Sequence, residues 1–584
     1  MDRTRRLLES GHFPTQLPPG FHSRDFSANY KSFLTGWSTL KDPSIQGRQT
    51  IQNPKKAPIS KIEAFSVARA GHRRRGTGIT NPVAQLYLSE YISQHWGSLL
   101  KHYRKSKLSA SRPRIRHDSP RGATIPSMKL HSETLLHRSA GYKYVLRTDI
   151  SRFFPTIYTH SIPWALHSKL VSKADRNRVP LYGNLLDETC RQLQDGQTIG
   201  LPIGPDTSHI IAEAIASAVD VQLCAQVGGL SGFRFVDDYY LFFHTRQEAE
   251  SCLASLAQLL SQYELQINFE KTRICETVEL SDDLWSHQLK AFPISNRGKA
   301  QARDLHHVFE LAKRLARENT DESVMLYAIK RASSIIVRPE NWDTFVAHLC
   351  HVAIAYPNTL QQIETIVSTY AGIGYPIKKA PLVRLVNSII KEHAPLNHHS
   401  EVAWCLWICK ANQLMLSQEN VAPVTNMRSS VCSLILLDME ASGLLPCAID
   451  YTAWDSVRHR LSLWGEQWLL CYEAGVRGWG NFAPDTVTAD QHFKLLADVA
   501  VRFYDSDASS APMFAFNLDA ILQAKGEIPE DLLQLLEEDD AEEYVTFEQD
   551  HGGYHSTALL DFSSLLEALV DESRPLENAG EDED

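Results

Sequence analysis

Two adjacent acids, Asp237 and Asp238, interrupt an apolar and aromatic stretch of this 584-residue chain. Their neighbours are bulky, strand-forming residues: Phe233, Phe235, Tyr239, Tyr240, Leu241, Phe242 and Phe243. Two carboxylates at the tip of an apolar hairpin repel each other and lose water, which is costly unless a cation neutralises them. The pattern FRFVDDYYLFF therefore indicates a cation site, with a solvated pair in an ordinary turn as the alternative.

A third acid, Asp149, ends another strand-like run and is followed by aromatic residues in DISRFFPTIY. Three carboxylates on neighbouring strand ends can hold two hard cations through oxygen ligands. Two such ions about 4 Å apart can activate an attacking hydroxyl and stabilise a leaving pyrophosphate. A structural charge cluster is the other interpretation, and the residues alone leave both open.

The elements that must position these acids are predicted from hydrophobic periodicity. In chain order they are two strands around a Gly/Arg-rich turn in 62–82, a helix at 83–100, a strand at 142–151, a helix at 204–223, two strands in 233–243, a helix at 247–263 and a strand at 264–276. A basic, Ser-rich loop is expected to reach about residue 122. This order indicates an α+β domain built on an antiparallel sheet.

Four segments within 142–276 resemble the catalytic motifs of reverse transcriptases, and they occur in the same order. They read DISRFFPTIY, GLPIGPDTSHIIAE, FRFVDDYYLFF and LQINFEKTR. Upstream, GHFPTQLPPGF and RRRGTGITNPVAQLYL resemble the entry segment and fingers of bacterial defence-associated reverse transcriptases of the abortive-infection type. The resemblance implies an α+β right-hand polymerase, with fingers and a palm built on an antiparallel sheet.

The resemblance also implies catalytic roles for individual residues. Asp149, Asp237 and Asp238 match the metal-binding carboxylates, and the carbonyl of Ile150 would be an additional metal ligand. Lys271 matches a lysine placed to protonate the leaving pyrophosphate, although an ordinary surface lysine is the alternative. The implied cofactor is a pair of Mg²⁺ ions, with Mn²⁺ as an acceptable substitute.

Nucleotide contacts are implied in the same way. Phe154 matches the bulky residue that stacks under the sugar and excludes a 2′-hydroxyl; an ordinary core aromatic is the alternative. Of the fingers arginines, Arg75 and then Arg74 are expected to contact the incoming triphosphate, because a guanidinium binds phosphate bidentately. Arg73 is expected to bind template or remain solvated. Gly204, within the second motif, completes the nucleotide-binding set.

The second motif departs from the family pattern at one position. It commonly reads PQG, but here Ile203 stands where a glutamine helps to orient nucleotide and template. This puts templating accuracy in doubt, and the branch that the chain resembles includes enzymes with protein-primed, untemplated DNA synthesis. No ribonuclease H or endonuclease motif is recognisable, so retroviral replication and intron mobility are not expected.

Charge is segregated along the chain, whose net charge is −10. The segment Glu527–Asp584 has 20 acids against one arginine, whereas residues 1–140 have 24 Lys and Arg against 8 acids. A basic front end is expected of a phosphate-binding surface, or of a solvated basic face. The apolar runs are shorter than the roughly 18–20 residues of a membrane span. Together with the absence of a signal peptide, this indicates a cytoplasmic protein that does not bind a membrane.

Four regions are predicted: an irregular N-terminal arm (1–60), reverse-transcriptase fingers and palm (61–290), an all-α C-terminal domain, thumb-like or a helical repeat (291–526), and an acidic segment (527–584). Cys405 and Cys409 fit buried thiols better than a zinc site.

The resemblance implies addition of deoxynucleotides from their triphosphates by two-metal catalysis, with RNA, DNA or both as partners, in bacterial antiphage defence. An inactive RNA-binding scaffold and a metal-dependent nuclease are the alternatives. Self-association into a homo-oligomer is left open.

Overall fold

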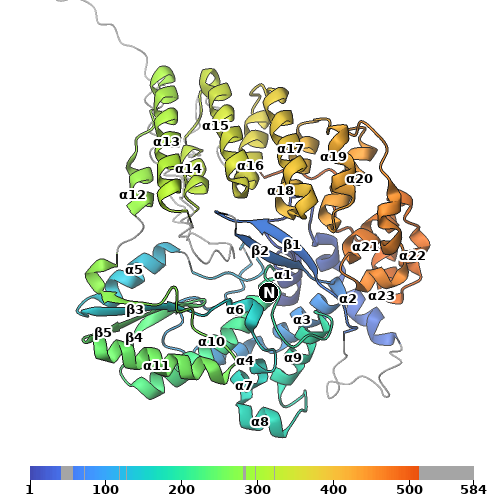
Figure 1. Ribbon diagram of the computed structural model, residues 1–584. Helices are drawn as coiled ribbons and strands as arrows, with labels where there is room; N and C mark the ends of the chain where they lie inside the picture. The colour runs from blue at the N-terminus through green and yellow to red at the C-terminus, as the bar shows by residue number, and fades with distance from the viewer. Residues whose placement is uncertain are drawn as a thin grey trace, which may run out of the picture.

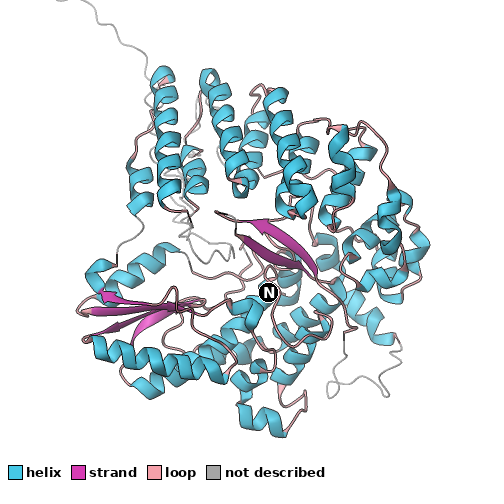
Figure 2. Ribbon diagram, in the orientation of Figure 1, coloured by secondary structure: helices cyan, strands magenta, loops and turns pink. Residues whose placement is uncertain are grey.

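The structure is a computed structural model that describes residues 1–40, 57–71, 73–117, 119–126, 128–280, 284–295, 297–320, 323–333 and 335–511. The predicted acidic segment 527–584 lies outside the described residues. Two small antiparallel sheets are set among many helices (Figures 1 and 2).

The larger sheet consists of β3 (Tyr144–Asp149), β4 (Ser231–Phe235), β5 (Asp238–Phe243) and β6 (Arg273–Glu276), in the order β4-β5-β3-β6. The predicted strand at 142–151 and hairpin in 233–243 are confirmed. The predicted strand at 264–276 is wrong for most of its length. Before β6 the stretch pairs with the end of β3 only through one antiparallel bridge, Ile267 to Ile150, and turn hydrogen bonds such as Lys271 N–H to the Asn268 carbonyl at 3.2 Å follow it.

Helices cover the sheet on both faces. The predicted helix at 247–263 is α11 (Arg246–Gln262), which begins with a capping box and packs against β3 and β5. On the other face, α5 (Met128–Ser139) contacts β4 and β5 (Figure 1). The predicted helix at 204–223 is α10 (Asp206–Val227), which packs against α11.

By length and composition, α10 is apolar enough to cross a membrane, which corrects the expectation that no segment would be. However, 67% of the most apolar 18-residue stretch of α10 is buried inside the protein. It contacts α4 (Trp96–Tyr103) and α7 (Ser161–His167) as well as α11. Packing within the protein therefore accounts for its apolar composition.

The smaller sheet is the hairpin of β1 (Glu63–Ala68) and β2 (Arg74–Ile79), which confirms the two strands predicted in 62–82. The single helix predicted at 83–100 is two helices, α3 (Pro82–Gln94) and α4, separated at His95. Between β3 and α10 lie four further helices: α6 (Phe153–Thr156), α7, α8 (Lys169–Ala174) and α9 (Tyr182–Gln192).

All described elements after β6 are helices, and they arch over the β1–β2 hairpin (Figure 1). They are η1 (Thr277–Glu279), α12 (Leu284–Ala291), α13 (Gly298–Glu318), α14 (Val324–Ala332), η2 (Pro339–Asn341), α15 (Trp342–Ala355), η3 (Pro357–Thr359), α16 (Leu360–Gly372), α17 (Lys379–His393), η4 (Ala394–Leu396), α18 (His399–Ala411), α19 (Gln418–Thr425), α20 (Ser430–Ala441), η5 (Tyr451–Val457), η6 (Arg460–Trp464), α21 (Trp468–Arg477), η7 (Trp479–Asn481), α22 (Pro484–Thr488) and α23 (Gln491–Asp498). Helix α18 contacts β1, which joins the arch to the hairpin.

The prediction of an irregular N-terminal arm is wrong for residues 1–40. They form α1 (Arg3–Glu9) and α2 (Arg24–Thr39), with Leu8, Phe26 and Trp37 fully buried. Helix α2 packs against α23, so the two ends of the described chain meet. The Pro- and Gly-rich composition belongs to the segment between the two helices, and apolar residues at helical spacing on either side outweigh it.

Candidate active site

The strand pairing brings the three acids to one end of the larger sheet. In the antiparallel register of β3 and β5, Asp149 lies opposite Asp238. Asp237 lies in the two-residue turn between β4 and β5, and its carbonyl accepts a hydrogen bond of 3.2 Å from the Ile150 amide. The predicted acids and Ile150 are therefore neighbours in space.

Asp149 and Asp237 are buried, whereas Asp238 is half-buried. The Nζ atom of Lys271 lies 3.0 Å from Asp149 Oδ2, so this lysine reaches the acidic site with a side chain that is 46% exposed. Asp149 Oδ1 is buried and has no hydrogen-bond partner among the described residues. A buried carboxylate oxygen without a hydrogen-bond partner destabilises the fold unless a cation binds it.

The turn that carries Asp237 has a strained backbone. Val236 has φ of +58°, which is an outlier for a β-branched residue. Such a conformation costs about 1–3 kcal/mol and persists only where the surroundings hold it. Here the Val236 amide donates to Ser111 Oγ at 2.7 Å, and its carbonyl accepts from Arg234 Nη1 at 2.6 Å.

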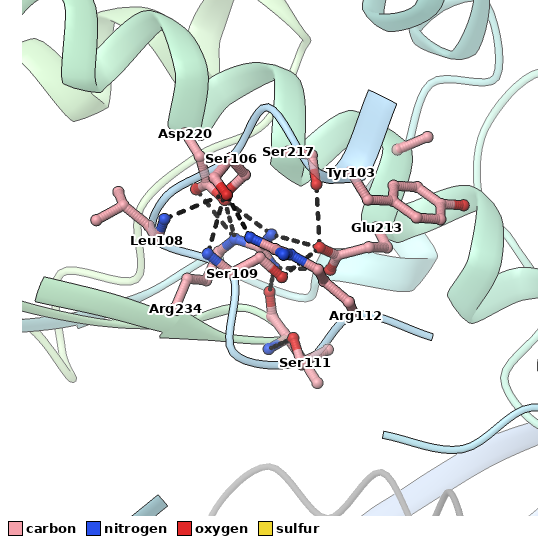
Figure 3. Close-up of polar contacts among 12 residues, drawn as sticks. Tyr103, Ser106, Leu108, Ser109, Ser111, Arg112, Glu213, Ser217, Asp220 and Arg234 are labelled. Atoms are coloured by element: carbon pink, nitrogen blue, oxygen red, sulfur yellow. Dashed lines mark hydrogen bonds and ion pairs between the residues drawn. The ribbon is translucent and has the colours of Figure 1, made fainter. Parts of the chain in front are cut away.

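Arg234 belongs to a buried polar network behind this turn (Figure 3). Its guanidinium pairs with Glu213 and Asp220 of α10, with Nη2 lying 2.9 Å from an oxygen of each. The Tyr239 hydroxyl donates to Asp220 at 2.9 Å. The sheet end is thus connected to α10 through an arginine that pairs with two carboxylates of that helix.

Sequence reasoning missed this network, although α10 contained a signal for it. Asp206, Glu213 and Asp220 are spaced seven residues apart in a largely apolar helix, so they share one face. Three acids on one buried face require cationic partners. Arg121 pairs with Asp206 at 2.5 Å, and Arg234 pairs with the other two.

A second part of the site lies where the β1–β2 hairpin meets the second motif. The Gly78 amide donates to the Ile203 carbonyl at 2.7 Å. Gly204 has φ of +129°, and a Cβ atom there would lie 2.7 Å from Pro14 Cγ, so only glycine fits. A cavity at this junction is lined by Arg75, Ile203 and Gly204, among others.

The adjacent arginines Arg74 and Arg75 point to opposite sides of β2, as successive strand residues do. Arg75 lines the cavity, whereas Arg74 Nη1 and Nη2 lie 2.5 and 2.9 Å from the two carboxylate oxygens of Glu401 on α18. The structure therefore brings Arg75, and not Arg74, to this junction. Potential metal ligands His393 and His398 lie near Glu401, but Arg74 already neutralises that acid.

Phe154 is buried on α6, with its ring centroid 6.5 Å from that of His209, which lines the same cavity. Its carbonyl accepts a hydrogen bond of 2.8 Å from the Leu201 amide, in the second motif. The position beside the cavity is compatible with sugar selection, and that role stays a prediction. Cys405 and Cys409 are buried free thiols, and burial raises the pKa of both.

Residues 98–295 match the sequence profile of the family described as reverse transcriptase (RNA-dependent DNA polymerase). This part of the chain is a reverse transcriptase domain. It contains all three acids and Lys271, and it makes the protein an RNA-directed DNA polymerase-type nucleotidyltransferase.

Solved structures similar to the chain include two telomerases. Telomerase from Candida albicans, in complex with a TWJ fragment of telomeric RNA, is 13% identical, with 66% of this chain and 69% of that chain covered and a TM-score of 0.27. Apo telomerase from Candida tropicalis is 12% identical, with 69% and 72% covered and a TM-score of 0.29. No curated protein sequence matches the chain.

Reverse transcriptase domains generally use divalent metal ions. The residues at the sheet end fit such ions, because carboxylate oxygens are the ligands that hard cations prefer. The buried Asp149 Oδ1, which lacks a hydrogen-bond partner among the described residues, is the observation that favours the fit.

Proposed function

We propose that the protein is a right-hand DNA polymerase that adds deoxynucleotides from their triphosphates. The sheet of β3 to β6 would be the palm and the β1–β2 hairpin part of the fingers, within a domain spanning about 61–290. The helices after residue 291 would form a separate C-terminal domain that replaces or extends the thumb. The single observation that carries the proposal is the register that pairs Asp149 with Asp238 beside the Asp237 turn.

Asp149, Asp237, Asp238 and the Ile150 carbonyl would hold two Mg²⁺ ions, or Mn²⁺ in their place. When bound, such ions would activate the attacking hydroxyl and stabilise the leaving pyrophosphate. Lys271, whose ammonium already lies at Asp149, would supply a proton to the leaving group.

On the nucleotide side, Arg75 would bind the triphosphate and Phe154 would lie under the sugar. Gly204 would allow the backbone of the second motif to approach the nucleotide. Arg75 and Gly204 line one cavity, and Phe154 lies next to His209 of the same lining, which supports a common role.

The synthesis is proposed to be untemplated and started on the protein itself, in bacterial antiphage defence in the cytoplasm. The replacement of glutamine by Ile203 and the resemblance to the abortive-infection branch support this. Priming requires a tyrosine or serine hydroxyl able to reach the palm. Tyr30 fits poorly, because it is buried and donates to the Asp2 carboxylate at 2.7 Å. Tyr544 and Tyr554 are better candidates, and they lie outside the described residues.

The proposal is tested by incubating the full chain with each labelled deoxynucleotide and Mg²⁺, with and without RNA and DNA primers. Label that enters acid-insoluble product supports polymerase activity, and label that stays on the denatured protein until protease or DNase releases it supports self-priming. Shortening of added nucleic acid without incorporation would instead indicate a nuclease. Product that is entirely free of protein would rule out self-priming.

A further inference from the structure

Behind the Val236–Asp237 turn, one arginine holds two acids in the interior. Arg234 Nε lies 3.0 Å from both oxygens of Asp220, and Nη1 lies 3.0 Å from Glu213 Oε2. Burial alone would lower the pKa of Arg234, but Asp220 and Glu213 raise it well above its ordinary value. Arg234 is therefore a fixed positive charge between α10 and β4 (Figure 3).

The same network fixes residues 106–111, which belong to the predicted basic, Ser-rich loop. Ser106 Oγ donates to Asp220 at 2.7 Å, and Ser109 Oγ donates to Glu213 at 2.6 Å. The backbone of the loop also pairs with β4, since the Arg234 amide donates to the Leu108 carbonyl at 2.8 Å. The loop, α10 and the hairpin thus share one set of charges.

Two contacts of this assembly end on the strained residue Val236. Arg234 Nη1 holds its carbonyl and Ser111 Oγ holds its amide, so both backbone polar groups are occupied. A β-branched residue does not adopt positive φ without such restraint. The next residue along the chain is Asp237.

We propose that Arg234 is a positioning residue for the active-site acids: it holds the Val236 turn so that Asp237 stays beside Asp149 and Asp238. This inference rests on the proposed function, because it assigns the turn a role in cation binding. Arg234 acts through the backbone of Val236, with Ser111 as the second support of the same turn.

A role in stability alone explains the network less well. Buried ion clusters can often be replaced by well-packed apolar residues without loss of stability. The hydrogen bond from Arg234 to the Val236 carbonyl, in contrast, restrains the turn that carries Asp237. Misplacing an active-site group by about 1 Å can lower a rate on the order of 10²-fold.

The test compares the full-length protein with Arg234→Lys and Ser111→Ala, using Arg477→Lys as a matched control. Arg477 also pairs with a fully buried glutamate, Glu473, at 3.3 Å, but on α21. Three quantities are measured on folded protein: Mn²⁺ affinity by electron paramagnetic resonance, hydrogen exchange of the 231–243 peptide without metal, and nucleotide incorporation against Mg²⁺ concentration.

We expect Arg234→Lys to weaken Mn²⁺ binding at least 10-fold, to speed exchange in the 231–243 peptide and to lower kcat on the order of 10²-fold, with KM for nucleotide little changed. Ser111→Ala removes only one hydrogen bond to the turn, so it should change the same quantities by less. It also keeps the inference testable if Arg234→Lys does not fold. Arg477→Lys should leave all three unchanged.

Wild-type Mn²⁺ affinity and exchange in folded Arg234→Lys and Ser111→Ala would overturn the inference. Failure of the proposed function would be visible separately, as an absence of nucleotide incorporation by the wild-type protein. In that case, Mn²⁺ affinity and hydrogen exchange would still decide whether Arg234 positions the acids.

Discussion

Two regions of this protein bury carboxylates, and they differ in the cationic partners that these carboxylates have. Between α10 and β4, Glu213 and Asp220 share the guanidinium of Arg234. At the sheet end, Asp149 has only the half-exposed Lys271 on one oxygen and no hydrogen-bond partner, among the described residues, on the other. The difference distinguishes acids that have an arginine partner within the fold from an acid whose neutralising charge is expected from a bound cation.

The largest expected effect comes from removing charge at the sheet end. Asp149→Asn or Asp237→Asn should lower nucleotide incorporation at least about 10³-fold, because an amide does not supply the negative charge that two divalent ions need. The melting temperature should stay the same or rise. Incorporation assays and thermal unfolding, each on purified protein, measure the two effects.

A matched substitution of a buried aspartate that already has a cationic partner should give the opposite result: lower stability and unchanged activity. Asp438 pairs with Lys410 at 2.8 Å, and both side chains are largely buried. Both residues are distant in sequence from the three acids of the sheet end. Asp438→Asn should lower the free energy of unfolding by about 3 kcal/mol, while incorporation per folded molecule stays unchanged. Full activity in Asp149→Asn or Asp237→Asn would end the comparison, because it would remove the metal assignment.

The two adjacent arginines of β2 sharpen the same contrast. Arg75→Ala should raise KM for the deoxynucleotide roughly 10–100-fold, since charge-assisted hydrogen bonds contribute about 1.5–3 kcal/mol. Arg74→Ala should mainly lower stability, by about 1–3 kcal/mol, because it leaves the buried Glu401 without its arginine partner. Steady-state kinetics and denaturant unfolding of both variants test this. Reversed effects would place Arg74 at the triphosphate.

A third pair contrasts two buried aromatic residues on α6. Phe154→Val should increase the use of ribonucleotides relative to deoxynucleotides about 10-fold, because a smaller side chain leaves room for the 2′-hydroxyl. Phe153 is equally buried, with its ring 5.4 Å away, so Phe153→Val is the control that loses packing without altering sugar preference. Competition between labelled ATP and dATP gives the ratio. An unchanged ratio in Phe154→Val would make Phe154 a core residue only.

Local patterns in the sequence were sufficient to predict the sheet end. Short runs of bulky, strand-forming residues predict the strands that carry Asp149 and Asp238, and the tight turn predicted within 233–243 contains Asp237. The Arg234 network was not predicted, because it assembles parts of a helix, a strand and the 106–111 loop that are distant in sequence. The N-terminal helices were missed for a different reason: proline and glycine in the segment between them dominated the composition of the whole region.

The smallest expected effect on nucleotide incorporation concerns a buried acid, distant from the sheet end, for which the described residues provide neither an arginine nor a lysine partner. Glu63 on β1 accepts a hydrogen bond of 2.6 Å from the Ser430 amide at the start of α20, and its other oxygen has no hydrogen-bond partner among the described residues. Burial raises the pKa of Glu63 from its ordinary 4.5 to about 8. Between these two values the folded state keeps a proton that the unfolded state releases, so stability should fall as pH rises. The slope due to this group is about 1.4 kcal/mol per pH unit, and it ends near pH 8.

Glu63→Gln should remove that part of the pH dependence and should make the protein more stable than wild type at pH 8. Urea unfolding of both proteins at pH 5, 6.5 and 8 measures the difference. Parallel pH profiles would show that Glu63 is charged in the folded state, and that a buried carboxylate in this protein can do without a cation.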